Sequence, residues 1–404
     1  MTLRHDTTLD TMAGPHPWRA TLAGAAAVFV GIGLARFAYT PLIPAVIDAG
    51  WFEPAAAVYL GAANLAGYLI GALLASRLAS RWPAVNVLRA MMLVASVAML
   101  ACATPVSFVW FFAWRLAAGI AGGALMVLAA PTVLPLVPMA RRGFAGGVIF
   151  TGVGLGIAAS GSLVPLLLTQ GIEAAWIGLG VLCLALTALA WTQWPSSTPS
   201  IAPATPAALS RGTTSRARRA LRGVYVTYGL NAVGLVPHMV FLVDFVARGL
   251  DRGIAAGALC WIAFGIGAIL GPTAAGAVAD RIGFVRALRL AFIIQAAATG
   301  LILIDQSWPA LLASSAIVGA FVPGVVPLVL GRVRALAPPE PKQQRAAWSL
   351  GTAAFALGQA AAAYALSWVF AQTGDYTLLF AAGVVAFVVA LVIDLLVGRD
   401  TERE

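Results

Sequence analysis

Two arginines lie inside stretches of sequence that are otherwise apolar. Arg36 is the single charged residue between Ala20 and Ile47, and Arg115 lies within the apolar run that begins at Phe108. An arginine at the centre of a bilayer costs about 2.5–3.5 kcal/mol on insertion scales, and such residues face a bundle interior or a water-filled cavity. These two positions therefore predict cations that face an enclosed space, where a guanidinium group binds anions.

We expect Arg36 to bind a ligand together with Tyr39, which follows three residues later on the same helical face. For Arg115 two interpretations stay open: it binds ligand or takes part in coupling, or it makes a structural hydrogen bond to backbone carbonyls or another helix. The helix around Arg36 is expected to be irregular, because two glycines precede the arginine and two prolines follow it.

The apolar stretch 223–247 carries two further candidates, His238 and Asp244. His238 is a candidate for ligand binding and for proton coupling because histidine titrates near neutral pH, although a lone helical histidine is more often a core residue. Asp244 is a candidate for coupling, either as counter-ion to a buried arginine or at the water boundary. Six residues separate the two, so they do not share a helical face and are not expected to act as a pair.

Uncharged polar residues in the apolar stretches complete the candidate site. Asn64 and Gln359 are predicted to bind ligand, with hydrogen bonding between helices as the competing interpretation. Asn231 and Gln295 are open to the same two interpretations.

Composition sets the class of protein. Of the 404 residues, 61% are hydrophobic and 10% are charged, and the mean hydropathy is +0.92. Apolar runs longer than about 18 residues recur, each long enough to cross a bilayer. The three cysteines and three scattered histidines show no metal or redox spacing, so neither a metal nor a cofactor is expected. The polar N-terminus does not resemble a signal peptide.

We therefore predict an all-α integral membrane protein with twelve transmembrane helices. Of the 25 Lys and Arg residues, 21 fall in the loops and tails of one side, two in those of the other side and two within the membrane. The positive-inside rule then places both termini in the cytoplasm, and the basic excess indicates topology rather than nucleic-acid binding. The predicted spans are 19–47, 55–78, 88–104, 108–137, 144–169, 175–194, 223–247, 254–278, 288–304, 308–331, 346–371 and 377–397.

One segment without apolar periodicity divides the spans into six and six. Residues 195–222 are rich in Pro, Ser, Thr and Arg, which is typical of a flexible linker. We predict a cytoplasmic tail over 1–18, six-helix bundles over 19–194 and 223–397, and a second tail over 398–404. The two bundles resemble each other at an offset of 200 residues, where Gly67, Gly71, Arg81, Leu88, Arg89 and Gly119 coincide with Gly267, Gly271, Arg281, Leu288, Arg289 and Gly319.

The loop after the eighth span carries a recognisable signature. Gly276-Ala-Val-Ala-Asp280-Arg281-Ile-Gly283-Phe-Val-Arg286 resembles the cytoplasmic loop motif G-x-x-x-D-R-x-G-x-x-R of the major facilitator superfamily. Arg115-Leu-Ala-Ala-Gly119-Ile-Ala-Gly122 and the glycine-rich fifth span are similar to further elements of that superfamily. The stretch GIGLARFAYTPLIP around Arg36 further resembles its YbfB/YjiJ-like branch.

The resemblance implies a two-domain carrier that works by alternating access. A carboxylate at the end of one helix can pair with arginines or helix ends of the other half and hold a gate shut, so Gly276, Asp280, Arg281, Gly283 and Arg286 are predicted to gate the cytoplasmic side. In the first half only Arg81 keeps the pattern, while Ser76, Ser80, Pro83 and Asn86 replace the other four residues. A merely solvated, basic loop is the alternative.

These observations favour a secondary active transporter of a small organic solute in the inner membrane, acting as a monomer in the lipid bilayer. Two arginines and one histidine against a single candidate carboxylate predict a net positive cavity and a substrate with a carboxylate or another anionic group. Coupling to protons and coupling by exchange both stay open. A drug or sugar efflux permease of the same fold is the alternative, and a receptor or an embedded enzyme is a distant one, because no nucleophile, carboxylate pair or metal cluster occurs near an interface.

Overall fold

The computed structural model describes residues 17–138, 141–195, 215–338 and 340–402, and over these residues the chain is helical, without strands. Within them, twelve helices are long and apolar enough to span a membrane, which confirms the predicted number. The predicted tail 1–18 and linker 195–222 lie mostly outside the described residues. The described part of the linker starts the helix α8 (Ser215–Val236), because its Arg, Ala and Leu residues are good helix formers.

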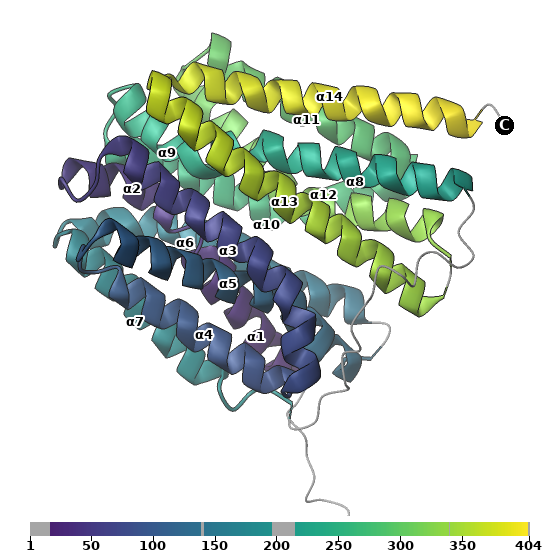
Figure 1. The fold of residues 1–404 in the computed structure, drawn as a ribbon, viewed down its shortest axis with the longest axis horizontal. Coiled ribbons are helices and arrows are strands. Elements are labelled where there is room, and N and C mark those ends of the chain that lie inside the picture. Colours follow the sequence, from purple (N-terminus) through teal and green to yellow (C-terminus); the bar gives the residue numbers. More distant parts are fainter. Residues whose placement is uncertain (1–16, 139–140, 196–214, 339, 403–404) are drawn as a thin grey trace, which may run out of the picture.

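The helices form two groups that lie side by side, one from each half of the sequence (Figure 1). The first group consists of α1 (Pro17–Val28), η1 (Phe29–Leu34), α2 (Tyr39–Asp48), α3 (Pro54–Arg81), α4 (Ala84–Ala101), α5 (Phe108–Val133), η2 (Leu134–Leu136), α6 (Arg142–Leu168) and α7 (Ile172–Ala190). The second consists of α8, η5 (Pro237–Phe241), α9 (Leu242–Asp244), η6 (Phe245–Gly249), α10 (Ile254–Ile282), α11 (Phe284–Ile304), α12 (Trp308–Leu336), α13 (Pro341–Thr373) and α14 (Tyr376–Glu402).

The first span of each half is the irregular one. The first span changes from α-helix to the π-helical η1, passes through a turn over residues 35–38 and resumes as α2. The seventh contains two π-helical segments, η5 and η6, on either side of α9. Prolines remove backbone donors and π turns widen a helix locally, so neighbouring helices must satisfy the freed groups. Arg36 lies in the turn and His238 in η5.

Within each half, glycines let two helices approach to backbone contact. A Cβ at Gly71 of α3 would overlap the backbone oxygen of Ile120 in α5, and a Cβ at Gly271 of α10 would overlap that of Ala320 in α12. The glycine matches at the 200-residue offset therefore mark the same close packing in both halves.

Between the halves, α6 packs against α10 and α3 packs against α13. Gly154 and Gly161 of α6 face Ile269 and Ile262 of α10. Trp261 Nε1 of α10 donates a hydrogen bond to Ser160 Oγ of α6 at 3.1 Å. The glycine-rich fifth span thus provides the surface on which one half meets the other.

Candidate functional site

The irregular turn of the first span borders a small cavity between the two halves, with a volume of about 20 Å³. None of the residues that line it is acidic. The lining residues are Arg36, Phe37, Tyr39, Thr40, Ile43, Gly61, Asn64, Leu65, Arg115, Met239 and Val240. The structure therefore brings both intramembrane arginines to one space, together with Tyr39 and Asn64.

The guanidinium group of Arg36 is held by neutral partners. Its Nη2 donates to Gln359 Oε1 of α13 at 2.5 Å, which joins the first half to the second. Its Cζ lies 5.0 Å from the ring centroid of Phe37 and 4.7 Å from that of Tyr68. Its Nε is buried without a hydrogen-bond partner in the described part of the chain. Aromatic contacts at the faces leave the edge of the guanidinium for in-plane hydrogen bonds.

Arg115 is buried, with 1% of its surface exposed, and it likewise has no acidic partner within the described residues. Its Nη1 donates to the backbone oxygen of Ala35 at 2.8 Å, and its Cζ lies 4.3 Å from the Tyr39 ring centroid. Its Nε is buried and has no hydrogen-bond partner among the residues that the structure describes. Arg115 thus makes the structural hydrogen bond to a carbonyl that was one of its two interpretations, and it also lines the cavity. Ligand binding by Arg115 stays a prediction.

Three polar side chains hold the walls of the cavity in place. The Tyr39 hydroxyl donates to Ala57 O at 2.8 Å, and Asn64 Nδ2 donates to Arg115 O at 3.2 Å. Thr40 Oγ1 donates to Met239 O at 2.7 Å, a third hydrogen bond between the halves. Thr40 was not recognised in the sequence, where a threonine next to Tyr39 carries no distinctive signal.

Comparisons with known proteins identify the family of this chain and a similar fold. The sequence model of the family described as "Uncharacterised MFS-type transporter YbfB" matches residues 28–395. This chain belongs to that family of major facilitator superfamily (MFS) transporters. No curated protein sequence matches the chain. A similar fold occurs in a structure described as "Crystal Structure of A Bacterial Homolog to Human Lysosomal Transporter, Spinster, in Inward-facing And Unoccupied Conformation". The TM-score is 0.69 at 15% identity, and the match covers 96% of this chain and 98% of that one.

The family and the fold confirm the predicted class, an MFS transporter built from twelve transmembrane helices. The remaining predicted site residues of this MFS transporter lie away from the cavity. His238 is fully buried in the second half, where its Nε2 lies 2.9 Å from Ser314 Oγ and its ring packs edge-on against Phe380. Neither His238 nor Gln359 is among the lining residues; Gln359 reaches the site through its bond to Arg36.

Asp244 is fully buried near the end of the molecule that carries Asp48, here called the Asp48 face. Its Oδ1 accepts from Arg248 Nη1 at 3.4 Å and its Oδ2 from the Tyr376 hydroxyl at 2.5 Å. Arg248 Nε in turn lies 3.7 Å from Asp48 Oδ1 of the first half. Asp244 is therefore the counter-ion of Arg248, and neither Arg36 nor Arg115 is among its hydrogen-bond or ion-pair partners.

The predicted gating residues lie at the opposite end of the MFS transporter, the Asp280 face. Asp280, Arg281, Gly283 and Arg286 are exposed, and among the described residues no ion pair joins Asp280 to another group. Gly283 ends α10 with φ of +81°, a conformation that favours glycine, and Gly276 has no neighbour near its Cβ position. Arg81 is exposed as well.

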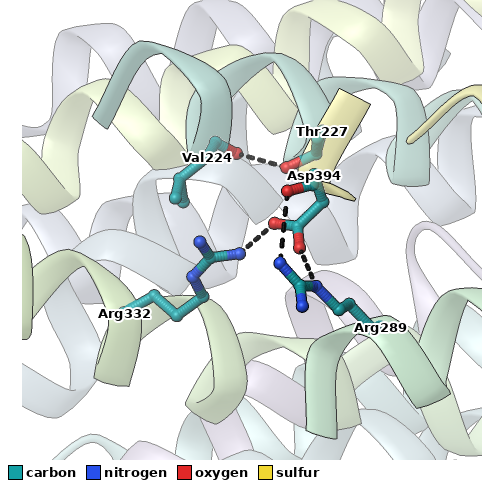
Figure 2. A network of polar contacts seen from close by, with 5 residues as sticks. All are labelled: Val224, Thr227, Arg289, Arg332 and Asp394. Atoms are coloured by element: carbon teal, nitrogen blue, oxygen red, sulfur yellow. Dashed lines mark hydrogen bonds and ion pairs between the residues drawn. The ribbon is translucent and has the colours of Figure 1, made fainter. Parts of the chain in front are cut away.

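An ion-pair network in the second half was missed by sequence reasoning (Figure 2). Asp394 of α14 is 3% exposed, and it accepts hydrogen bonds from Arg289 Nε of α11 at 2.8 Å and from Arg332 Nη1 of α12. The sequence assigned both arginines to loops and recognised one candidate carboxylate in the membrane. Asp394 adds a second, and the signal that would have revealed it is a lone acid in the otherwise apolar span 377–397.

Proposed function

We propose that this MFS transporter moves a small organic solute that carries a carboxylate or a comparable anionic group, and that Arg36 and Arg115 bind this group. The observation that supports the proposal is the pairing of two guanidinium groups on one cavity whose lining contains no acid. Arginine stays protonated under physiological conditions, so the cavity keeps its positive charge.

The energetic cost of two buried guanidinium groups also favours an anionic substrate. A buried charge without a counter-ion is destabilising by several kcal/mol, and cation–π contacts of about 0.5–2 kcal/mol each offset only part of that cost. The Nε atoms of Arg36 and Arg115 are both buried and unpaired. An anion that enters the cavity supplies a counter-charge together with hydrogen-bond acceptors for these donors, whereas a neutral sugar offers acceptors without the counter-charge and a cation adds a like charge.

The proposed transport cycle follows from where the halves are joined. In the described part of the chain, the hydrogen bonds and ion pairs between the halves are Asp48–Arg248, Thr40–Met239, Ser160–Trp261 and Arg36–Gln359. All four lie between the Asp48 face and the level of the cavity, whereas Asp280 is exposed at the other end. We infer a carrier, monomeric in the inner membrane with both termini cytoplasmic, in which Asp280, Arg281 and Arg286 engage when the Asp48 face opens.

Coupling has two candidate routes. Asp244 is the buried carboxylate closest to the Asp48–Arg248 contact, so its protonation would free Arg248 and coupling would run through protons. His238 offers a second proton site. Alternatively, two substrate anions exchange, because each one neutralises the arginines on its own stroke.

The first test is a ligand-dependent melting screen of purified protein with organic acids, amino acids, sugars and lipophilic cations. Ligands that bind only the folded protein stabilise it and raise its melting temperature. At a ligand concentration of a hundred times Kd, the free energy of unfolding rises by about 2.7 kcal/mol. We expect carboxylates to stabilise the wild type and not Arg36→Ala. Arg89→Ala is the matched control, because Arg89 also contacts a ring and a carbonyl, those of Trp191, outside the cavity.

Uptake into proteoliposomes with the stabilising compounds, with and without an imposed pH gradient, then separates proton coupling from exchange. Stabilisation by sugars or cations alone, or an equal response of Arg36→Ala and wild type, would refute the anionic substrate.

A further inference from the structure

Asn64 lines the cavity and carries an unpaired hydrogen-bond acceptor. The residue is 1% exposed on α3, lines the cavity and donates through Nδ2 to the backbone oxygen of Arg115. Since a carbonyl oxygen only accepts, this bond fixes which end of the amide faces Arg115. The other end, Oδ1, is buried and has no hydrogen-bond partner among the described residues.

The unpaired atoms at this site have opposite hydrogen-bonding roles. The Nε atoms of Arg36 and Arg115 are donors, and Asn64 Oδ1 is an acceptor. Buried polar groups are nearly always paired, and an unpaired one is destabilising, so three unpaired atoms on residues that line one cavity point to a ligand that pairs them. The cavity of about 20 Å³ has room for about one water molecule, so a solute enters only when the two halves separate. A simple carboxylate satisfies the two donors and leaves Asn64 Oδ1 without a donor.

We propose that the substrate is a 2-hydroxycarboxylate: its carboxylate binds the guanidinium edges of Arg36 and Arg115, and its neighbouring hydroxyl donates to Asn64 Oδ1. This inference rests on the proposed anionic substrate and narrows it. Asn64, Arg36 and Arg115 all line the same small cavity, so we expect the hydroxyl and the carboxylate to be neighbours in the substrate.

The positive charge of the cavity favours a hydroxyl over an ammonium group as the donor to Asn64 Oδ1. A 2-amino acid also carries a donor beside its carboxylate, but its ammonium group would face two guanidinium groups in a cavity without acid. The rest of the lining suits a small apolar substituent on the substrate, because it includes the apolar residues Ile43, Leu65, Met239 and Val240.

Matched ligand pairs test the inference on the wild-type protein. Affinities are measured by titration calorimetry on detergent-purified protein for 2-hydroxypropanoate, propanoate and 2-aminopropanoate, and for an arylalkyl pair with and without the 2-hydroxyl. We expect each 2-hydroxycarboxylate to bind at least about tenfold more tightly than its deoxy partner, as a hydrogen bond to an otherwise unpaired buried group requires. The amino acid should bind more weakly than either.

Two variants assign the preference to Asn64. Asn64→Leu should reduce the ratio of hydroxy to deoxy affinity to near one. Asn231→Leu is the matched control, because Asn231 is equally buried, donates through Nδ2 to Gln295 Oε1 at 2.9 Å, leaves its Oδ1 unpaired and does not line the cavity. It should keep the wild-type ratio.

The outcomes separate this inference from the one on which it rests. Equal binding of hydroxy and deoxy acids, both abolished by Arg36→Ala, would overturn the hydroxyl preference and leave the anion site standing. Binding of neither, or binding that survives Arg36→Ala, would refute the anion site itself. A hydroxyl preference that persists in Asn64→Leu would also overturn the assignment to Asn64. The wild-type ratio decides whether the substrate is a 2-hydroxycarboxylate even if that variant fails to fold.

Discussion

Removing the charge of Asp394 should destabilise the second half strongly. Its carboxylate is 3% exposed and binds two arginines whose side chains are 22% and 9% exposed, Arg289 and Arg332. Breaking a buried ion pair by removing one partner costs about 3–5 kcal/mol, because the other charge stays buried. Asparagine keeps one acceptor and Arg289 has access to solvent, so we expect Asp394→Asn to lower the free energy of unfolding by about 3 kcal/mol, at the low end of that range.

The measurement is the free energy of unfolding in mixed dodecyl maltoside–SDS micelles, with tryptophan fluorescence as the signal. It is made for each member of a double-mutant cycle. Arg332→Gln alone should also be destabilising, while Asp394→Asn with Arg332→Gln should cost much less than the sum of the two. The more buried of the two cations is then gone, and the remaining one, Arg289, is 22% exposed and reaches solvent. Asp305→Asn is the control: this carboxylate is exposed between α11 and α12, where the backbone N–H and the hydroxyl of Ser307 hold its pKa below the ordinary value. A loss within about 0.5 kcal/mol for Asp394→Asn, or additive effects in the cycle, would refute the structural role of the network.

Two further predictions concern the contact between the halves and the packing within them. Asp48→Asn removes the ion pair to Arg248 and leaves that between Arg248 and Asp244 in place, so a cysteine introduced at the buried Ile43 should react about two- to fivefold faster with a membrane-impermeant maleimide than in the parent, as expected for a partly exposed ion pair. Unchanged labelling would mean that this ion pair does not keep the Asp48 face closed. Gly71→Ala should lower the free energy of unfolding by about 1–3 kcal/mol because the added Cβ meets the Ile120 backbone. Gly276→Ala, at a glycine with open space around it, should be neutral in a melting assay, and equal losses for the two variants would contradict the packing inferred for α3 and α5.

The residues of the cavity could be named from the sequence because a charge in an apolar run has few structural explanations. Arg36 and Arg115 stood out on those grounds, and the structure places both on one cavity. Their contacts could not be named, because partners in a bundle come from helices far apart in the sequence. Arg36 and Gln359 are 323 residues apart and yet share a hydrogen bond.

The same limit explains the missed network. Counting basic residues by side of the membrane grouped Arg289 and Arg332 with the loops of one side, whereas the structure places them in α11 and α12, where both meet the same carboxylate. Asp394 lies 105 residues from Arg289 and 62 from Arg332. Asp244 shows the reverse case: its partners Arg248 and Tyr376 include a residue four positions away, a spacing that helical periodicity does mark.

The internal repeat has kept its geometry while its chemistry has diverged. Arg89 and Arg289 occupy matching positions on α4 and α11, and each reaches the last helix of its own half. Arg89 binds the backbone oxygen and ring of Trp191, which are neutral, whereas Arg289 binds the buried carboxylate of Asp394. The acceptor therefore changed from a carbonyl to a charge that also holds Arg332 of a third helix. The second half is thereby cross-linked by charges near the Asp280 face, where the first half relies on a carbonyl and a ring. In the proposed transport cycle each half moves as a unit, and the ion-pair network ties α11, α12 and α14 together on the side of the loop that carries Asp280, Arg281 and Arg286.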